Sequence, residues 1–347
     1  MAKEVGGLKN DREMDSLLST GEQRTITLLA MAIEALGIPA ISLTGYQCGF
    51  ITNDHHAHAR IVDVDITNLQ KHLNDGKVVV VAGFQGASKQ GEITTLGRGG
   101  SDTTAVALAA KLGWNCHIYT DVDGVYTCDP RLFPKAKRIR EITYHEMMEM
   151  ACLGSGVLET RSVELASKYK VPLYLARTLE KEKKGTYIVE KLKKLEDMPI
   201  SGISVKDDYV IMQVHSLPQD GKYLGELFRL IAKLDINLDT ISQQLNRDGS
   251  VDFSFYCTKV QSDKILEHID TLSEKQEVTC LLGFVKISVV GIGISTHSGI
   301  ASKVLNTLSA NGVRYYMITS SEISISLTIE AKDKQKAITC LGEAFDL

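Results

Sequence analysis

Residues 78–102 read VVVVAGFQGASKQGEITTLGRGGSD. The four consecutive valines predict a strand over residues 77–84 that is buried on both faces of a parallel sheet. A glycine-rich segment follows and leads into an apolar run from Thr103 to Leu112, which predicts a helix. Glycine-rich backbone at a helix N-terminus presents unpaired N–H groups and the positive end of the helix dipole. The stretch therefore predicts a site for a phosphate or a carboxylate.

Two side chains of this turn suit an anion. Arg98 can bind a carboxylate in bidentate fashion, and Ser101 can donate a hydrogen bond to it. The alternative is a tight strand-to-helix turn in which Arg98 pairs on the surface. The sequence has neither G-x-x-x-x-G-K-[ST] nor G-x-G-x-x-G, which argues against a P-loop and a Rossmann site.

On both sides of this stretch, strand and helix patterns alternate. Such alternation predicts an α/β domain with a largely parallel sheet between helices, whose ligands lie at the carboxyl ends of the strands. A capping box at Thr143–Glu146 predicts the start of one helix. The other expected elements are helices at 21–36 and 66–73 and strands at 38–43, 117–120 and 172–176.

The C-terminal part contains an internal repeat. Residues 227–242 and 304–319 align without gaps at an offset of 77, and each copy reads as a helix, a turn and a strand. Flanking strands and helices complete two βαββαβ units of ferredoxin-like type. A dimerisation platform and a ligand sensor both fit this pattern. The charged segment at 191–199 marks the end of the α/β domain, which is predicted to span residues 1–197. The two repeat units are then predicted to span 198–280 and 281–347.

Composition narrows the functional classes. The chain has 347 residues, 44% hydrophobic and 24% charged, with a net charge of -4, which predicts a globular protein that does not bind nucleic acid. Its seven cysteines contain no C-x-x-C pair and read as reduced thiols in the cytoplasm. The N-terminus lacks the pattern of a signal peptide, and the sequence predicts no membrane span.

Two further segments bear on chemistry. Residues 120–131, TDVDGVYTCDPR, follow a strand and suit either a nucleotide-binding loop or a solvated turn. His55, His56 and His58 invite a metal interpretation, but nothing near them supplies the further ligand and second shell that zinc needs. An exposed polar loop without metal is the preferred interpretation. No activated cysteine or G-x-S-x-G elbow supports covalent catalysis.

Five segments in order resemble the aspartate kinases along almost the whole chain. They are Ser19–Glu22 (STGE), Thr44–Gly49 (TGYQCG), Thr94–Asp102 (TTLGRGGSD), Thr120–Arg131 and Arg161–Leu165 (RSVEL). The resemblance implies an amino-acid-kinase fold followed by two ACT modules. It also implies transfer of the γ-phosphate of ATP, with Mg²⁺, to the side-chain carboxylate of L-aspartate. That reaction is the first step of lysine, threonine and methionine biosynthesis.

The resemblance also assigns roles. It implies a homodimer or higher oligomer formed through the ACT modules, and lysine or threonine as effector. The residues implied are Arg98 and Asp102 for catalysis; Glu22, Arg98 and Ser101 for aspartate; Gly99, Gly100, Thr120, Asp121, Tyr126 and Arg131 for ATP; and Asp239 and Gln243 for the effector.

The chain departs from the family pattern in three places. The family begins with a strand and a K-F-G-G-T-S loop, and this sequence starts after them. Gly156 stands where the family has a nucleotide-binding lysine, and Arg314 where relatives commonly have an asparagine. Missing cations near the phosphates would lower the rate. A misplaced start, a strand supplied by a partner, and a non-catalytic paralogue that serves as an amino-acid-sensing regulatory subunit therefore stay open as alternatives.

Overall fold

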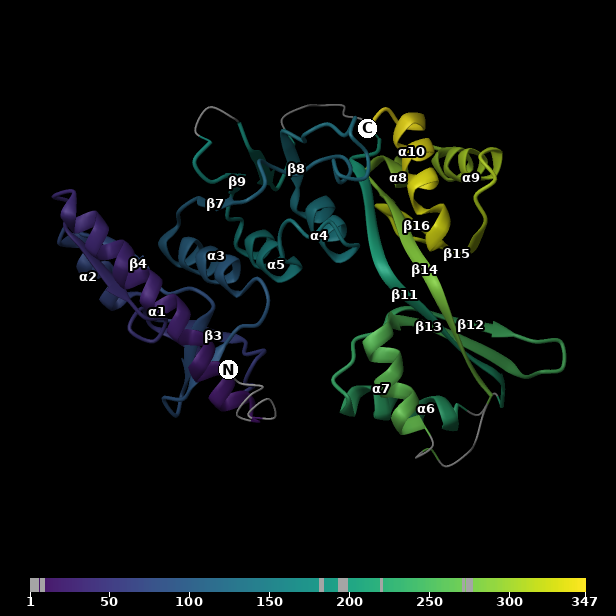
Figure 1. Ribbon diagram of the computed structural model, residues 1–347, viewed down its shortest axis with the longest axis horizontal. Coiled ribbons are helices and arrows are strands. Elements are labelled where there is room, and N and C mark those ends of the chain that lie inside the picture. Colours follow the sequence, from purple (N-terminus) through teal and green to yellow (C-terminus); the bar gives the residue numbers. More distant parts are fainter. Residues whose placement is uncertain are drawn as a thin grey trace. The chain divides into compact units, whose positions relative to one another are not determined.

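The computed structural model describes residues 6, 10–180, 184–192, 199–218, 221–269, 272 and 277–347 (Figure 1). The chain divides into two compact units. The first comprises residues 1–125, 138–152 and 156–196, and the second comprises 126–137, 153–155 and 197–347. The predicted boundary between residues 197 and 198 lies outside the described residues.

The first unit alternates short strands with helices, as the sequence predicts. Its helices are α1 (Asp11–Ala35), α2 (Thr67–Asn74), α3 (Gly100–Leu112), α4 (Tyr144–Cys152) and α5 (Thr160–Tyr169). Its strands are β1 (Ala40–Leu43), β2 (Phe50–Thr52), β3 (Ile61–Val64), β4 (Val78–Val81), β5 (Gln85–Ser88), β6 (Ile93–Thr95), β7 (Cys116–Thr120), β8 (Glu141–Thr143), β9 (Leu173–Arg177) and β10 (Thr186–Val189).

Parallel pairs recur among these strands. β1 pairs in parallel with β4, β2 with β5, β7 with β9, and β8 with β10. The strands are ordered β1-β4, β3-β2-β5-β6 and β7-β9-β10-β8 within their sheets. The α/β class with parallel pairing is therefore confirmed. The sequence missed the β5–β6 hairpin, because the glycine-rich segment 85–95 lacks the apolar alternation of a half-buried strand.

One prediction about the valine strand is wrong. Val78 is 42% exposed, and the rest of β4 is only partly buried. Within the described chain β4 pairs with β1 in a sheet of two strands, so it is an edge strand and is not covered on both faces. A run of valines favours a strand whether one face or both faces are buried, because valine has a high β-propensity. The sequence does not show which strands lie beside β4.

Helix α1 begins ten residues earlier than predicted. Asn10 caps it by accepting a hydrogen bond from the Glu13 N–H at 3.3 Å. Its buried positions are Asp15, Ser19, Ile26 and Ala30, all on one face. The first two are polar, so apolar periodicity does not reveal the first turns of this helix.

The capping box before α4 is confirmed. The Thr143 hydroxyl donates to Glu146 Oε2 at 2.7 Å, and the Glu146 N–H donates to Thr143 Oγ1 at 3.3 Å. The Thr143 N–H donates back to Glu146 Oε2 at 3.2 Å. Donors at the helix start are thus satisfied by side chains three residues apart.

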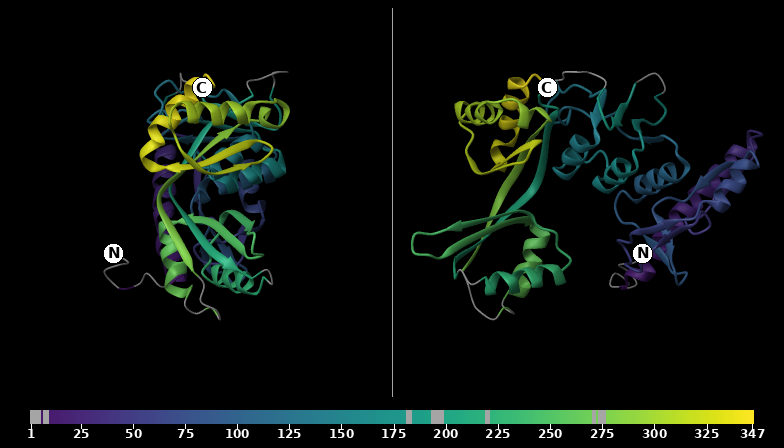
Figure 2. Two further views of the ribbon diagram at one scale, coloured as in Figure 1. Left: turned by 90° about the vertical axis from the view of Figure 1, so that its right-hand side faces the viewer. Right: turned by 180° about the vertical axis from the view of Figure 1, so that it is seen from behind.

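The second unit is built on one sheet, ordered β12-β13-β11-β14-β16-β15 (Figure 2). The strands are β11 (Gly202–Leu217), β12 (Asp239–Leu245), β13 (Val251–Thr258), β14 (Val278–Val290), β15 (Tyr315–Ser320) and β16 (Ser324–Glu330). The helices are α6 (Lys222–Lys233), α7 (Lys259–Ile269), α8 (Gly293–Thr296), α9 (Ile300–Ala310), the 3₁₀ turn η1 (Ala331–Asp333) and α10 (Lys334–Ala344).

Both sequence repeats share the two long central strands. Residues 209–214 of β11 pair with 278–284 of β14 in the first repeat, whereas residues 202–206 pair with 286–290 in the second. Each repeat thus has a four-stranded antiparallel sheet with its own helices and its own apolar core. The predicted border at residues 280–281 falls inside β14, because one strand serves both repeats.

Candidate functional site

The glycine-rich turn after β6 leads directly into the N-terminus of α3. Gly99 is the N-cap residue of α3, with a φ of 63°, which a glycine adopts without steric cost. A Cβ on Gly83 would lie 3.1 Å from the Ser101 Cα, so the end of β4 passes close to the first turn of the helix. Ser101 itself is exposed. Backbone N–H groups of such a first turn lack partners inside the helix.

Charged groups of both signs surround this helix start. Arg98 is exposed, and the described residues offer its guanidinium no ion-pair partner. Burial raises the pKa of Asp102, and the charge of Glu159 adds to the effect. Glu159 packs on Gly99, since a Cβ there would lie 1.8 Å from Glu159 Cγ. The N-terminus of α3 therefore follows an exposed arginine and has two carboxylates, those of Asp102 and Glu159, close to its first turn.

The RSVEL segment supports the turn from α5. Arg161 Nη1 donates to the carbonyl oxygen of Leu96 at 3.1 Å. Burial lowers the pKa of this guanidinium, and the charge of Arg60 lowers it further. Arg161 therefore fixes backbone two residues before Arg98, a role that the sequence did not show.

Glu22 lies on the same face of α1 as Asp15 and Ser19. Gln85 Nε2 donates to the carbonyl oxygen of Ser19 at 3.0 Å, and α1 packs on β6. Glu22 is half-buried one turn further along the helix. The same unit thus contains Glu22, Arg98, Ser101 and Asp102, the residues predicted for aspartate and catalysis.

The residues predicted for ATP divide between the two units. Thr120 ends β7 and its hydroxyl donates to Asp121 Oδ1 at 3.0 Å, and both residues belong to the first unit with Gly99 and Gly100. Tyr126 and Arg131 belong to the second unit. The Arg131 guanidinium is ion-paired with Asp129, with 2.7 Å between Nη2 and Oδ2. The nucleotide roles of Tyr126 and Arg131 stay predictions from the sequence.

The predicted effector residues both lie on β12. Asp239 contacts two ammonium groups, with Lys286 Nζ 3.0 Å from Oδ1 and Lys206 Nζ 3.2 Å from Oδ2. Lys286 is only 5% exposed, and its Nζ lies 5.5 Å from the ring centroid of Tyr209. Gln243 is exposed. The two lysines lie on β11 and β14, so sequence spacing gave no sign of this cluster.

The histidine segment contacts helix α1. Among the described residues, no group of three or more His, Cys, Asp or Glu side chains could hold a metal ion. His55 and His58 are exposed, whereas His56 is half-buried and lies 2.8 Å from Asp15 Oδ2.

Gly156, at the position where the family has a lysine, is exposed and has a φ of 63°.

Replacement of Gly99 tests the geometry of the helix start. Gly99→Ala is expected to strain the left-handed backbone by about 1–2 kcal/mol and to displace Glu159. We therefore expect weaker binding of ADP, measured by titration calorimetry. Gly113→Ala is the matched control, because Gly113 has a φ of 69° at the other end of α3 and a Cβ there meets open space. Equal ADP affinity in both variants would contradict a nucleotide role for this turn.

Comparison with known proteins gives matches along the whole chain. The model of the amino acid kinase family matches residues 3–177, and an ACT-domain model matches residues 287–345. An aspartokinase of Bacillus sp. (strain MGA3) is 42% identical over 354 residues, which cover 100% of this chain and 85% of the relative. An aspartate kinase of Pseudomonas putida is also 42% identical, over 352 residues with the same coverage.

Solved structures give the same result. E. coli aspartokinase III in complex with aspartate and ADP has a TM-score of 0.84 and 26% identity, covering 99% of this chain and 78% of the other. The complex of that enzyme with lysine and aspartate has a TM-score of 0.76 at 25% identity, with the same coverage.

Among the described residues, no helix combines the length and the apolar character that a membrane span needs.

The fold and the two family matches together define an amino acid kinase joined to a C-terminal ACT domain. The enzyme class is that of a phosphotransferase that uses a nucleotide. Within that class, the chain belongs to the aspartokinase family.

Proposed function

We propose that this chain transfers the γ-phosphate of ATP to the side-chain carboxylate of L-aspartate, giving 4-phospho-L-aspartate and ADP. The observation that carries this proposal is the start of α3, where the exposed Arg98 stands beside helix N–H groups and a glycine-lined approach. Such a site binds anions. E. coli aspartokinase III, which has the same fold, binds aspartate and ADP.

The substrate has one ammonium and two carboxylates. We propose that Glu22 faces the ammonium and that Arg98, with Ser101 beside it, binds a carboxylate. Opposite charges at its two ends would then orient the amino acid. For the nucleotide, the proposal covers Gly99, Gly100, Thr120 and Asp121 in the same unit.

The chemistry requires little beyond charge and position. The acceptor carboxylate is ionised at pH 7, so it needs no general base. Its approach to the triphosphate is opposed by like charge, which Arg98 and the N-terminus of α3 would offset. Asp102 and Glu159 supply hard oxygen donors of the kind that Mg²⁺ prefers, and the raised pKa of Asp102 indicates that a cation would be favourable there. Magnesium bound with ATP would neutralise charge on the phosphates.

Regulation is part of the proposal. E. coli aspartokinase III has been solved in complex with lysine, and the second unit of this chain carries the corresponding α/β repeats. We propose lysine or threonine as effector, at a site that includes Asp239 and Gln243, and a homodimer or higher oligomer formed through the repeats. The seven free thiols suit a cytoplasmic enzyme of lysine, threonine and methionine biosynthesis.

A coupled assay of ADP release tests the activity. We expect turnover with L-aspartate and MgATP, little with L-glutamate, and none after EDTA removes the metal. Binding of ADP to the folded chain, measured by calorimetry, separates a lack of nucleotide binding from a slow chemical step. Folded protein that binds ADP but never phosphorylates aspartate would contradict the proposal and favour the regulatory alternative.

A further inference from the structure

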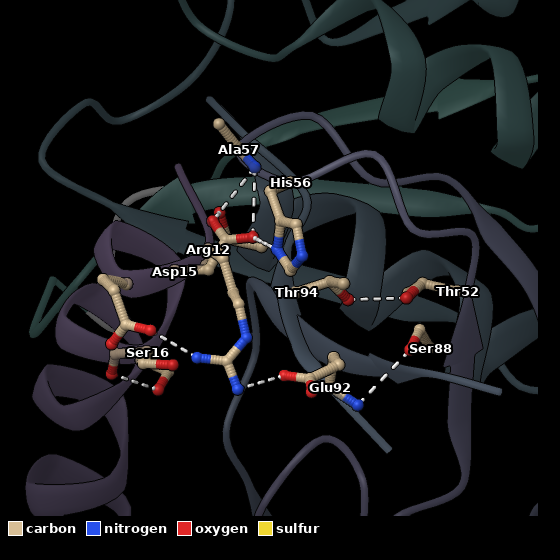
Figure 3. Close-up of polar contacts among 12 residues, drawn as sticks. Arg12, Asp15, Ser16, Thr52, His56, Ala57, Ser88, Glu92 and Thr94 are labelled. Atoms are coloured by element: carbon tan, nitrogen blue, oxygen red, sulfur yellow. Dashed lines mark hydrogen bonds and ion pairs between the residues drawn. The ribbon is translucent and has the colours of Figure 1, made fainter. Parts of the chain in front are cut away.

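The carboxylate of Asp15 is fully buried within a network of polar contacts (Figure 3). His56 Nδ1 lies 2.8 Å from its Oδ2, the Ala57 N–H donates to Oδ1 at 3.0 Å, and the Thr95 hydroxyl also donates to Oδ1. These donors come from the loop of residues 54–58 and from β6. Burying a carboxylate without such donors would cost on the order of several kcal/mol. Asp15 therefore ties α1 to two other segments of the first unit.

The loop that Asp15 holds lies directly against the turn that carries Arg98. A Cβ on Gly97 would lie 3.1 Å from the carbonyl oxygen of Ala57 and 2.8 Å from His58 Nδ1. The Ala59 N–H donates to the carbonyl oxygen of Thr95 at 2.9 Å. The backbone of residues 57–59 thus forms one wall of the turn, and Arg161, bonded to Leu96, supports the turn from α5.

Other contacts fix the same helix to the same hairpin. Figure 3 shows Arg12, one turn before Asp15, paired with Glu92 between β5 and β6. This pair is exposed and contributes little on its own. Asp15 differs because its contacts are buried and lead to the backbone beside Arg98. Glu22 lies two turns further along the same helix, so one residue connects both groups proposed to bind the amino acid.

We infer that Asp15 is a positioning residue that sets the distance between Glu22 on α1 and the Arg98 turn. Its three acceptor contacts hold residues 56–57 and β6 in place, and residues 57–58 in turn confine Gly97. Rigid spacing of a carboxylate and a guanidinium selects the length of the amino acid between them. The effect on catalysis rests on the proposed function, whereas the effect on the backbone of the turn does not.

The first test compares Asp15→Ala with Asp15→Asn. The alanine removes all three acceptor contacts, and we expect the KM for L-aspartate to rise about tenfold or more while kcat changes less. Asparagine keeps an oxygen for the Ala57 N–H and the Thr95 hydroxyl, and its amide can donate to a neutral His56. We therefore expect Asp15→Asn to restore most of the affinity for aspartate.

Hydrogen exchange of the full chain without substrate provides a readout independent of activity. In Asp15→Ala, amides of residues 96–99 are expected to exchange faster than in the unchanged protein. Ile26→Ala is the matched control, because Ile26 is buried on the same face of α1 and lies outside this network. It is expected to lower stability and leave exchange at residues 96–99 unchanged relative to the rest of the unit.

Two results would overturn the inference. One is unchanged exchange at residues 96–99 in folded Asp15→Ala, and the other is the same exchange pattern in Asp15→Ala and Ile26→Ala. If Asp15→Ala does not fold, His56→Gln tests the same network at a half-buried position, with a smaller increase in exchange expected. A chain without kinase activity would contradict the proposed function and leave the exchange result valid.

Discussion

Arg98→Ala is expected to lower kcat/KM for L-aspartate by about a hundredfold or more. Arg98 is exposed just before α3, and the described residues offer its guanidinium no ion-pair partner, so we expect its removal to leave the fold intact. What is lost is a cation that would bind the substrate carboxylate and offset its repulsion from the phosphates. The coupled ADP-release assay over a range of aspartate concentrations measures this loss.

Two variants make the result specific. Arg98→Lys keeps the charge and loses the bidentate geometry, so an intermediate activity is expected. Arg24→Ala removes another exposed arginine, on α1, and is expected to leave kcat/KM unchanged. An Arg98→Ala enzyme as active as the Arg24→Ala enzyme would show that the turn before α3 does not bind aspartate.

Asp239→Ala is expected to destabilise the second unit by about 3 kcal/mol or more. The substitution leaves Lys286, 5% exposed, as a buried cation without its carboxylate. Lys206→Ala is the control, because its side chain is 34% exposed and the remaining Lys286 still neutralises Asp239. We expect a loss of about 1 kcal/mol or less from it.

Urea unfolding followed by two signals measures this difference. The chain has one tryptophan, Trp114, which lies in the first unit, so its fluorescence reports on that unit. Far-ultraviolet circular dichroism reports on both units, and the sheet of the second contributes strongly. We expect Asp239→Ala to shift the dichroism transition and leave the fluorescence midpoint in place. A shift of both signals by the same amount would show that the cluster does not stabilise the second unit separately.

The pH dependence of this cluster follows from its charges. Burial alone would raise the pKa of Asp239, but the charges and hydrogen bonds of Lys286 and Lys206 hold it well below its usual range. A carboxyl whose pKa is lower in the folded state contributes stability above its unfolded pKa of about 3.9 and loses it as the pH falls further. The difference between the unchanged protein and Asp239→Ala should therefore be constant near neutral pH and shrink below about pH 4.

Much of this protein could be predicted from local patterns. Helix periodicity and the capping box at Thr143 depend on neighbouring residues, the repeat at an offset of 77 shows as similarity within one sequence, and all three appear in the structure. The turn before α3 could also be predicted from its glycines, since the left-handed backbone at Gly99 favours a residue without a Cβ. The order of the five motifs identified the family, which the comparisons confirm.

Other features depended on contacts between distant segments. Asp15 and His56 are 41 residues apart, and Asp239 and Lys286 are 47 apart, so no spacing rule connects either pair. Polar residues on a buried helix face look like solvent-exposed positions until the partner segment is known. The sharing of β11 and β14 by both repeats, and the edge position of β4, likewise follow from strand pairing.

The sequence by itself determined the class of fold, the family and the position of the glycine-rich turn before α3. The fold class and the turn follow from short-range patterns of apolar residues and glycines, and the family follows from the resemblance of five motifs in order. Only the tertiary structure decided which buried charges neutralise one another and which loop holds the Arg98 turn. The physical reason is that the cost of burying a charge is removed by whichever donors the fold brings within hydrogen-bonding distance, and those donors are distant in sequence.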